Sequence, residues 1–137
     1  MSWVDGHFKD HERAEKESAK VRLRAEQLYD ELWKEITDRV MDARNGGMLV
    51  STNGSSYERV VLLGGAVMLR PFSEAKQLTI TLEDRRKIVV TWEDGTIEIP
   101  LRVRPDGVVC LTHQARELTI PEAAKLILEP FLFPPRP

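Results

Sequence analysis

The sequence has a single cysteine, Cys110, so the chain cannot form an internal disulfide. It has no apolar run approaching the roughly 18 residues that span a bilayer, and its first residues lack the basic start and apolar stretch of a signal peptide. It also lacks an excess of either charge, since 20 Lys and Arg oppose 22 Asp and Glu. We therefore expect a cytoplasmic protein with no membrane partner and no global field that draws it to nucleic acid.

Motifs of enzymes and metal sites are missing as well. The chain has no Gly-x-Ser-x-Gly elbow, no paired-cysteine zinc motif and no dinucleotide-binding fingerprint. His7 and His11 stand four residues apart, but the segment around them has few apolar residues to support a metal shell. Cys110 and His113 are an odd number of positions apart, so in a strand they face opposite sides. We predict no catalytic residue, no metal site and no cofactor.

What the sequence does contain is a long segment with helical periodicity. Neither Gly nor Pro occurs in residues 11–43, and Tyr29 and Trp33 widen an apolar stripe that repeats every three or four positions. The members of the stripe are Val21, Ala25, Leu28, Leu32, Ile36, Val40 and Ala43. A helix of about 33 residues is roughly 50 Å long, which exceeds the diameter of a small domain. The stripe is thin before Val21, so we expect residues 1–19 to form a projecting or partly disordered N-terminal segment.

After Gly46 and Gly47 the pattern changes to the period of two that is typical of strands. Turn signals separate apolar runs at 48–52, 57–63, 66–70, 76–82, 87–93, 96–104 and 108–112. Gly64 and Gly65 predict a two-residue hairpin turn between the second and third runs. Pro100 cannot donate to a strand ladder, so it predicts an unpaired side or a bulge.

The C-terminal part predicts a short helix and a tail. Thr119 and Glu122 have the spacing of a capping box, and Pro121 suits the first turn of the helix. We expect Pro130 to end this helix and the first part of the tail, residues 131–137, to dock on the domain. The fold class is therefore α+β, with one domain over residues 1–137. A long N-terminal helix packs on a curved antiparallel meander of about six to seven strands, and a short C-terminal helix follows.

A cationic line runs along the early helix, because Arg13, Lys16, Lys20 and Arg24 are spaced by three or four residues. Acidic residues are interleaved with this line, and no aromatic platform for base stacking accompanies it. We interpret it as a salt-bridged solvent face and do not expect a nucleic-acid partner. The less favoured hypothesis is a nucleic-acid binder that uses this line and whose binding falls steeply with salt.

Two hypotheses on function remain. In the first, the chain is a non-catalytic protein-interaction or assembly module that forms a homo-oligomer or binds another protein, using Val21, Ala25, Leu28 and Leu32 for self-association. In the alternative, it is a small-molecule-binding or simple enzymatic domain with a cavity between helix and sheet. Trp33 and Trp92 would line that cavity, and a small molecule would be the partner.

Overall fold

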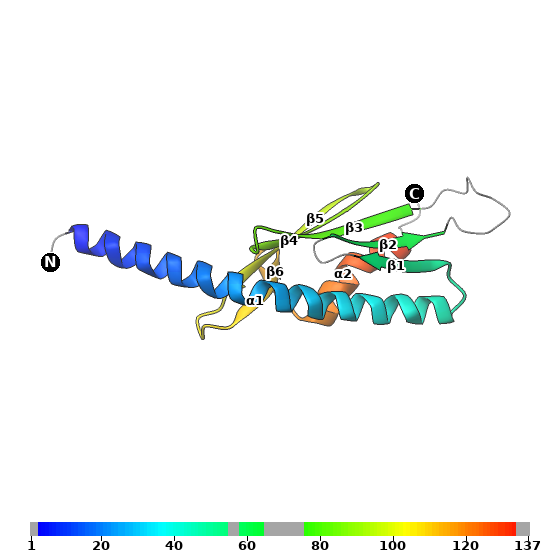
Figure 1. Cartoon of the computed structure of the whole chain (residues 1–137), viewed down its shortest axis with the longest axis horizontal. Helices are drawn as coiled ribbons and strands as arrows, with labels where there is room; N and C mark the ends of the chain where they lie inside the picture. The colour runs from blue at the N-terminus through cyan, green and yellow to red at the C-terminus, as the bar shows by residue number, and fades with distance from the viewer. Residues whose placement is uncertain (1–2, 55–57, 65–75, 134–137) are drawn as a thin grey trace.

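The computed structural model of the chain describes residues 3–54, 58–64 and 76–133, with the backbone alone for residues 3–14. A long helix is followed by seven strands and a short helix, so the protein has an α+β fold (Figure 1). The elements are α1 (Trp3–Asn45), β1 (Val50–Gly54), β2 (Glu58–Leu63), β3 (Lys76–Glu83), β4 (Lys87–Trp92), β5 (Gly95–Val103), β6 (Val109–His113), β7 (Arg116–Leu118) and α2 (Ile120–Leu132).

The strands form one antiparallel sheet in which spatial order follows sequence order from β1 to β7. Strand β5 changes partner at Pro100: residues 95–100 pair with β4, whereas Leu101 to Val103 pair with β6. The predicted unpaired side at Pro100 is therefore confirmed. The Thr112 hydroxyl donates to the Pro100 carbonyl at 2.8 Å and so satisfies an acceptor beside this change of partner.

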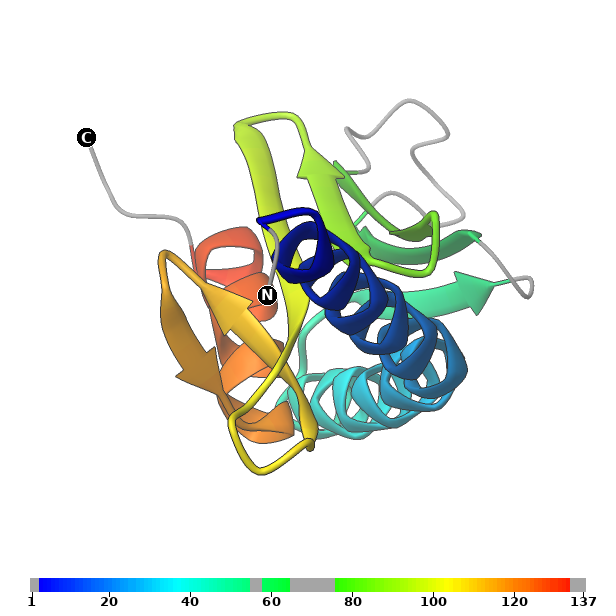
Figure 2. The same cartoon turned by 90° about the vertical axis from the view of Figure 1, so that its left-hand side faces the viewer.

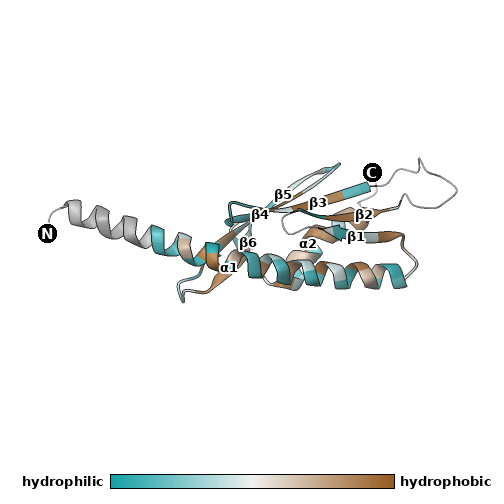
Figure 3. Cartoon of the chain, viewed as in Figure 1, coloured by the Kyte–Doolittle hydropathy of each residue, from teal (hydrophilic) through white to brown (hydrophobic). Residues whose placement is uncertain are grey.

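Both helices cover the same face of the sheet and pack on each other (Figure 2). The apolar stripe of α1 is buried from Val21 to Val40, and Leu32 and Ile36 are completely excluded from solvent. The strands supply the other side of the core through Leu78, Ile88 and Ile99, among others. In Figure 3 brown hydrophobic segments mark β2 and β3, whereas the part of α1 that packs on the sheet alternates between teal and brown. The predicted stripe is therefore the face that packs against the sheet.

Helix α1 begins earlier than predicted and extends far beyond the sheet (Figure 1). Ser18 and Lys20 mark the margin of the folded body: the Arg86 Nη2 atom lies 3.4 Å from Ser18 Oγ, and a Cβ on Gly107 would lie 3.4 Å from Lys20 Nζ. We call residues 3–17 the arm. At 1.5 Å per residue the arm is about 22 Å long. At its N-terminal end α1 therefore overhangs the sheet (Figure 1). In the described part of the chain, no helix combines the length and the apolar character that crossing a bilayer requires.

Helix α2 begins as predicted but ends later. The Thr119 side chain accepts from the Glu122 backbone N–H, and the Glu122 carboxylate accepts from the Thr119 N–H, so the capping box is present. The prediction that Pro130 ends the helix is wrong, because α2 continues to Leu132 with Pro130 inside it. Phe131 and Leu132 are buried, and this packing offsets the hydrogen bond that a proline removes.

The hairpin turn predicted at Gly64 and Gly65 falls partly outside the described residues. Among the described strands, β2 pairs with β1 on one edge and with β3 on the other. The strand predicted at 66–70 lies outside the described residues. Strand β7 was missed because its hairpin turn uses Gln114 and Ala115 at φ values of 51° and 63°, positions where glycine or asparagine normally signals such a turn.

Candidate functional site

The four residues predicted to mediate self-association lie inside the core of their own chain. Val21 and Leu28 are 8% and 6% exposed, and Ala25 and Leu32 are fully buried. These side chains therefore offer no free surface to a second copy. Any surface on α1 that is available for association lies on its other faces or before residue 18.

The two tryptophans predicted to line a cavity are both half-buried and pack against the core. They lie on different elements, Trp33 on α1 and Trp92 at the end of β4. Neither contributes to the hollows that are described below. Trp33 instead lies beside an arginine, with its ring centroid 5.8 Å from the Arg59 guanidinium carbon.

Arg59 is an unexpected charged residue on the helix-facing side of the sheet. It shares this face of β2 with Val61, and it lies opposite Gly54 on β1 and Ile80 on β3. Gly54 makes room for it: a Cβ at position 54 would lie 2.9 Å from Arg59 Cγ. The missing side chain at this position lets the arginine stem cross toward α1.

The Arg59 side chain is only 12% exposed and is held by three groups of α1. Its Nη2 atom contacts Asp30 Oδ1 at 2.5 Å, its Nη1 atom donates to the Tyr29 carbonyl at 3.4 Å, and its guanidinium lies 4.3 Å from the Tyr29 ring centroid. A cation over an aromatic face at this distance is attractive. Arg59 therefore fixes the β1–β2 side of the sheet to the middle of α1.

Tyr29 completes this connection from the helix side. Its hydroxyl donates to the Ile80 carbonyl at 2.7 Å, and its side chain is almost fully buried. Burial raises the pKa of Tyr29 to about 12, although the nearby Arg59 charge acts in the opposite direction. The phenol is therefore neutral at physiological pH and acts as a structural donor.

A hollow of about 500 Å³ opens between α1 and the β3–β4 turn next to Arg59. Its lining carries three carboxylates and two guanidiniums, and we call it the charged hollow: Glu26, Tyr29, Asp30, Arg59, Leu82, Asp84 and Arg85. The Arg85 Nη2 atom contacts Glu26 Oε1 at 3.0 Å across its mouth. Such a lining could hold a small polar molecule through charge-assisted hydrogen bonds.

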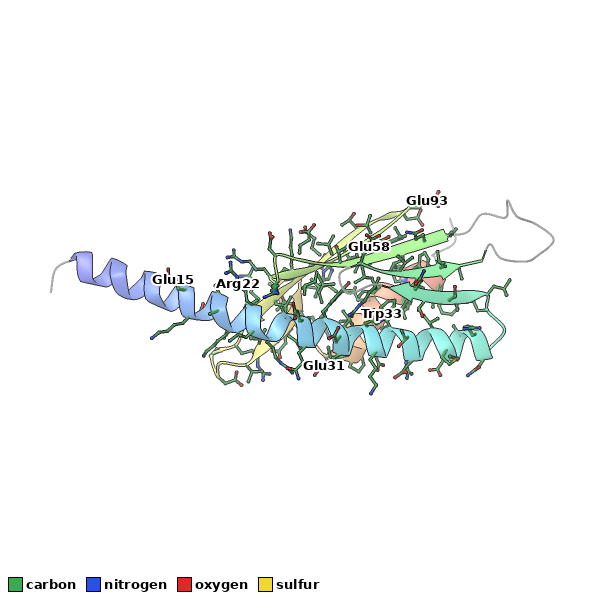
Figure 4. The ribbon with its side chains drawn as sticks, in the orientation of Figure 1. Glu15, Arg22, Glu31, Trp33, Glu58 and Glu93 are labelled. Carbon is green, nitrogen blue, oxygen red and sulfur yellow. The ribbon has the colours of Figure 1, made fainter. Side chains whose placement is uncertain are left out.

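A second hollow, of about 510 Å³, adjoins the first on the side of the arm. We call it the arginine hollow, because Arg22, Arg85 and Arg86 line it together with Asp84. The turn between β3 and β4 brings Arg85 and Arg86 to α1, and Arg22 projects from the helix itself (Figure 4). This concentration of cationic groups lies where α1 leaves the body.

Five large apolar side chains of the described residues are exposed: Leu23, Met41, Leu49, Val108 and Phe133. Phe133, at the end of α2, is 63% exposed and borders two hollows of about 650 and 640 Å³. Leu23 on α1 is 84% exposed and follows directly after Arg22. An apolar side chain that is so exposed beside a projecting helix is a candidate contact for another molecule.

The structure gives no chemical activation to Cys110. Burial raises the pKa of its thiol, with a smaller contribution from the Glu117 carboxylate, so the thiolate that acts as a nucleophile is disfavoured. His113 lies at the end of the same strand, and its Nδ1 atom is 3.2 Å from the Glu98 carbonyl. Within the described residues, no three His, Cys, Asp or Glu side chains gather where they could hold one metal ion. The side chains of His7 and His11 lie outside the described residues.

Sequence reasoning missed Arg59, although a signal was present. Arg59, Val61 and Leu63 alternate along the second predicted strand, and this period of two places the arginine on the same face as the apolar residues. A charged residue in that register predicts a partner across the core. Comparison with known protein families, with curated proteins and with solved structures found no match to this chain.

Proposed function

We propose that this protein is a non-catalytic assembly module that self-associates through the N-terminal part of α1. The observation that carries this proposal is the arm, a continuous helix that extends about 22 Å beyond Ser18, where Arg86 contacts α1. In Figure 1 this part of α1 extends past the edge of the sheet. Extended helices of this kind gain most of their stability when one face packs against another element.

The composition at the margin of the body supports an interface there. Leu23 is almost fully exposed, Ala19 is exposed, and the arginine hollow lies beside them. Apolar groups surrounded by charged groups are typical of transient or moderate protein interfaces. The four stripe residues that first suggested self-association instead anchor α1 in the body, and so hold the arm in a fixed direction.

The test is the molar mass of the full chain by light scattering from low to high micromolar concentration. We expect a dimer or larger assembly, and we expect a variant that lacks residues 1–14 to be a monomer with the same unfolding profile. A full chain that stays monomeric at high micromolar concentration contradicts the proposal. A shortened chain that still dimerises contradicts the role of the arm.

A second candidate function rests on the charged hollow. It lies between helix and sheet, as the alternative hypothesis requires, and Arg59 is fixed at its base. A small polar or zwitterionic molecule fits a lining that carries both signs of charge. We would titrate a panel of amino acids and small dicarboxylates while following tryptophan fluorescence. This function is supported if Glu26→Gln weakens the binding and Lys34→Glu leaves it unchanged. Saturable binding that Glu26→Gln does not affect contradicts a role for this hollow.

A further inference from the structure

We infer that two copies of this chain pair the N-terminal parts of α1 antiparallel, so that residues 3–12 of each copy lie along residues 13–22 of the other. This inference rests on the proposed self-association and gives it a geometry. Two residues that face each other have residue numbers whose sum is about 25. The two-fold axis therefore passes between residues 12 and 13. Such an interface is isologous and closes at two copies.

Charge distributes unevenly along this part of α1. Residues 3–12 carry Asp5, Asp10 and Glu12 against Lys9, which gives a net side-chain charge of −2. Residues 13–22 carry four basic side chains, Arg13, Lys16, Lys20 and Arg22, against Glu15 and Glu17, which gives +2. Antiparallel pairing places the acidic half against the basic half at both ends of the interface. Parallel pairing would place like charges together, which is unfavourable.

The arginine hollow strengthens this complementarity at the margin of the body. Arg86 reaches the helix at Ser18, and Arg22 lies one turn further along, so both guanidiniums flank residues 18–22. Three arginines line this hollow, and the nearby carboxylates are Asp84 and Glu26, of which Glu26 contacts Arg85. The hollow is therefore surrounded by three positive and two negative charges. In the antiparallel register, residues 3–7 of the other copy lie here, and they include Asp5. The basic margin of one body therefore meets the acidic tip of the other arm.

Leu23 gives the same register an apolar contact. In this register position 23 lies beside the N-terminal end of the other helix, where the sequence has the two apolar residues Trp3 and Val4. Leu23 is 84% exposed in the single chain. The two bodies lie at opposite ends of the paired helices, so they do not compete for space. This register therefore packs the two helices against each other in the middle and adds an apolar contact at each end.

Cysteine cross-linking tests the orientation. In a Cys110→Ser background, Gly6→Cys and Ala19→Cys place one thiol in each half of the helix, and Ala19 is exposed. Antiparallel packing brings position 6 of one copy beside position 19 of the other, within reach of a bismaleimide that spans about 10 Å. Like positions are then separated by 13 residues, or about 20 Å along the helix axis. We expect cross-linked dimers only when the two variants are mixed.

The other outcomes separate this inference from the proposed function. Cross-linking of each variant with itself, in a chain that is dimeric by light scattering, indicates parallel arms and overturns the inference alone. A dimer without any arm cross-link overturns the arm as the interface but leaves self-association. A monomer under all conditions overturns the proposed function itself.

Charge reversal tests the complementarity in the full chain. We expect Asp5→Lys and Arg86→Glu each to raise the dimer dissociation constant about tenfold at low salt, because each change acts at both ends of the two-fold interface. An equimolar mixture of the two variants should recover wild-type affinity for the heterodimer within about threefold. Lys34→Glu makes the same kind of charge change at an exposed position of α1 outside the pairing, and should leave the constant unchanged. A mixture that does not recover, or an equal effect of Lys34→Glu, overturns the inference.

Discussion

Arg59 offers the sharpest test of how α1 is held to the sheet. Its guanidinium is stacked on Tyr29 and almost buried, whereas the Asp30 side chain that it contacts is 66% exposed. Ion pairs with a solvent-exposed member contribute about 0–1 kcal/mol, so Asp30→Asn should lower the free energy of unfolding by no more than that. Arg59→Ala also removes the ring contact, the packed stem and the hydrogen bond to the Tyr29 carbonyl. These losses add up to about 2–4 kcal/mol.

The measurement is urea unfolding followed by circular dichroism at one fixed protein concentration, because association also affects apparent stability. Arg59→Met keeps most of the apolar stem and should fall between the two variants, at about 1–2 kcal/mol. The control is Arg102→Ala on the outer face of β5, where the side chain is exposed and the expected change is within about 0.5 kcal/mol. If Asp30→Asn lowers the unfolding free energy as much as Arg59→Ala does, the ion pair rather than the ring contact holds α1, and the reasoning fails.

Four further predictions follow from single contacts. Gly54→Ala should destabilise the protein by about 1–3 kcal/mol in urea, since its Cβ would lie 2.9 Å from Arg59 Cγ, and an Arg59→Ala background should reduce this loss. Since folding raises the pKa of Tyr29 from 10.0 to about 12, its contribution to stability is complete below pH 10 and disappears toward pH 12; Tyr29→Phe should flatten that part of the stability profile, and an unchanged profile contradicts the assignment. Thr119→Ala should lower the unfolding free energy by about 1 kcal/mol through loss of the α2 cap. Hydrogen bonds to Thr119 lower the pKa of Glu122 in the folded chain. The contribution of Glu122 to the free energy of unfolding is therefore present above pH 4.5 and is lost as the pH falls through the lowered pKa of the folded state. The stability of wild type and of Glu122→Gln, measured against pH, should converge in acid.

The elements that the sequence predicted well are those with a strong local signal. The apolar stripe from Val21 to Val40 repeats at the helical period over many turns, and the structure buries that face. The Thr119 capping box and the partner change at Pro100 also follow from single residues whose backbone chemistry allows few alternatives. Local chemistry was therefore enough to fix the fold class and most strand positions.

The predictions that failed depended on contacts between distant segments. Pro130 would end an isolated helix, but burial of Phe131 and Leu132 continues α2 past it. The turn at Gln114 and Ala115 has no glycine to signal it, and only the pairing of β6 with β7 holds those two residues at positive φ. In each case tertiary packing outweighed a local preference of a few kcal/mol at most.

The candidate sites were decided by the tertiary structure as well. Sequence alone determined that α1 is amphipathic and longer than the domain that it covers, because residue spacing and rise per residue are local properties. It did not determine which side of α1 remains available. Three features depend on segments that lie far apart in the chain. The predicted association residues are buried, Arg59 packs beside Gly54, and Arg22 lies next to the β3–β4 turn. A local pattern sets which residues share a face, whereas only the packed chain decides what that face contacts.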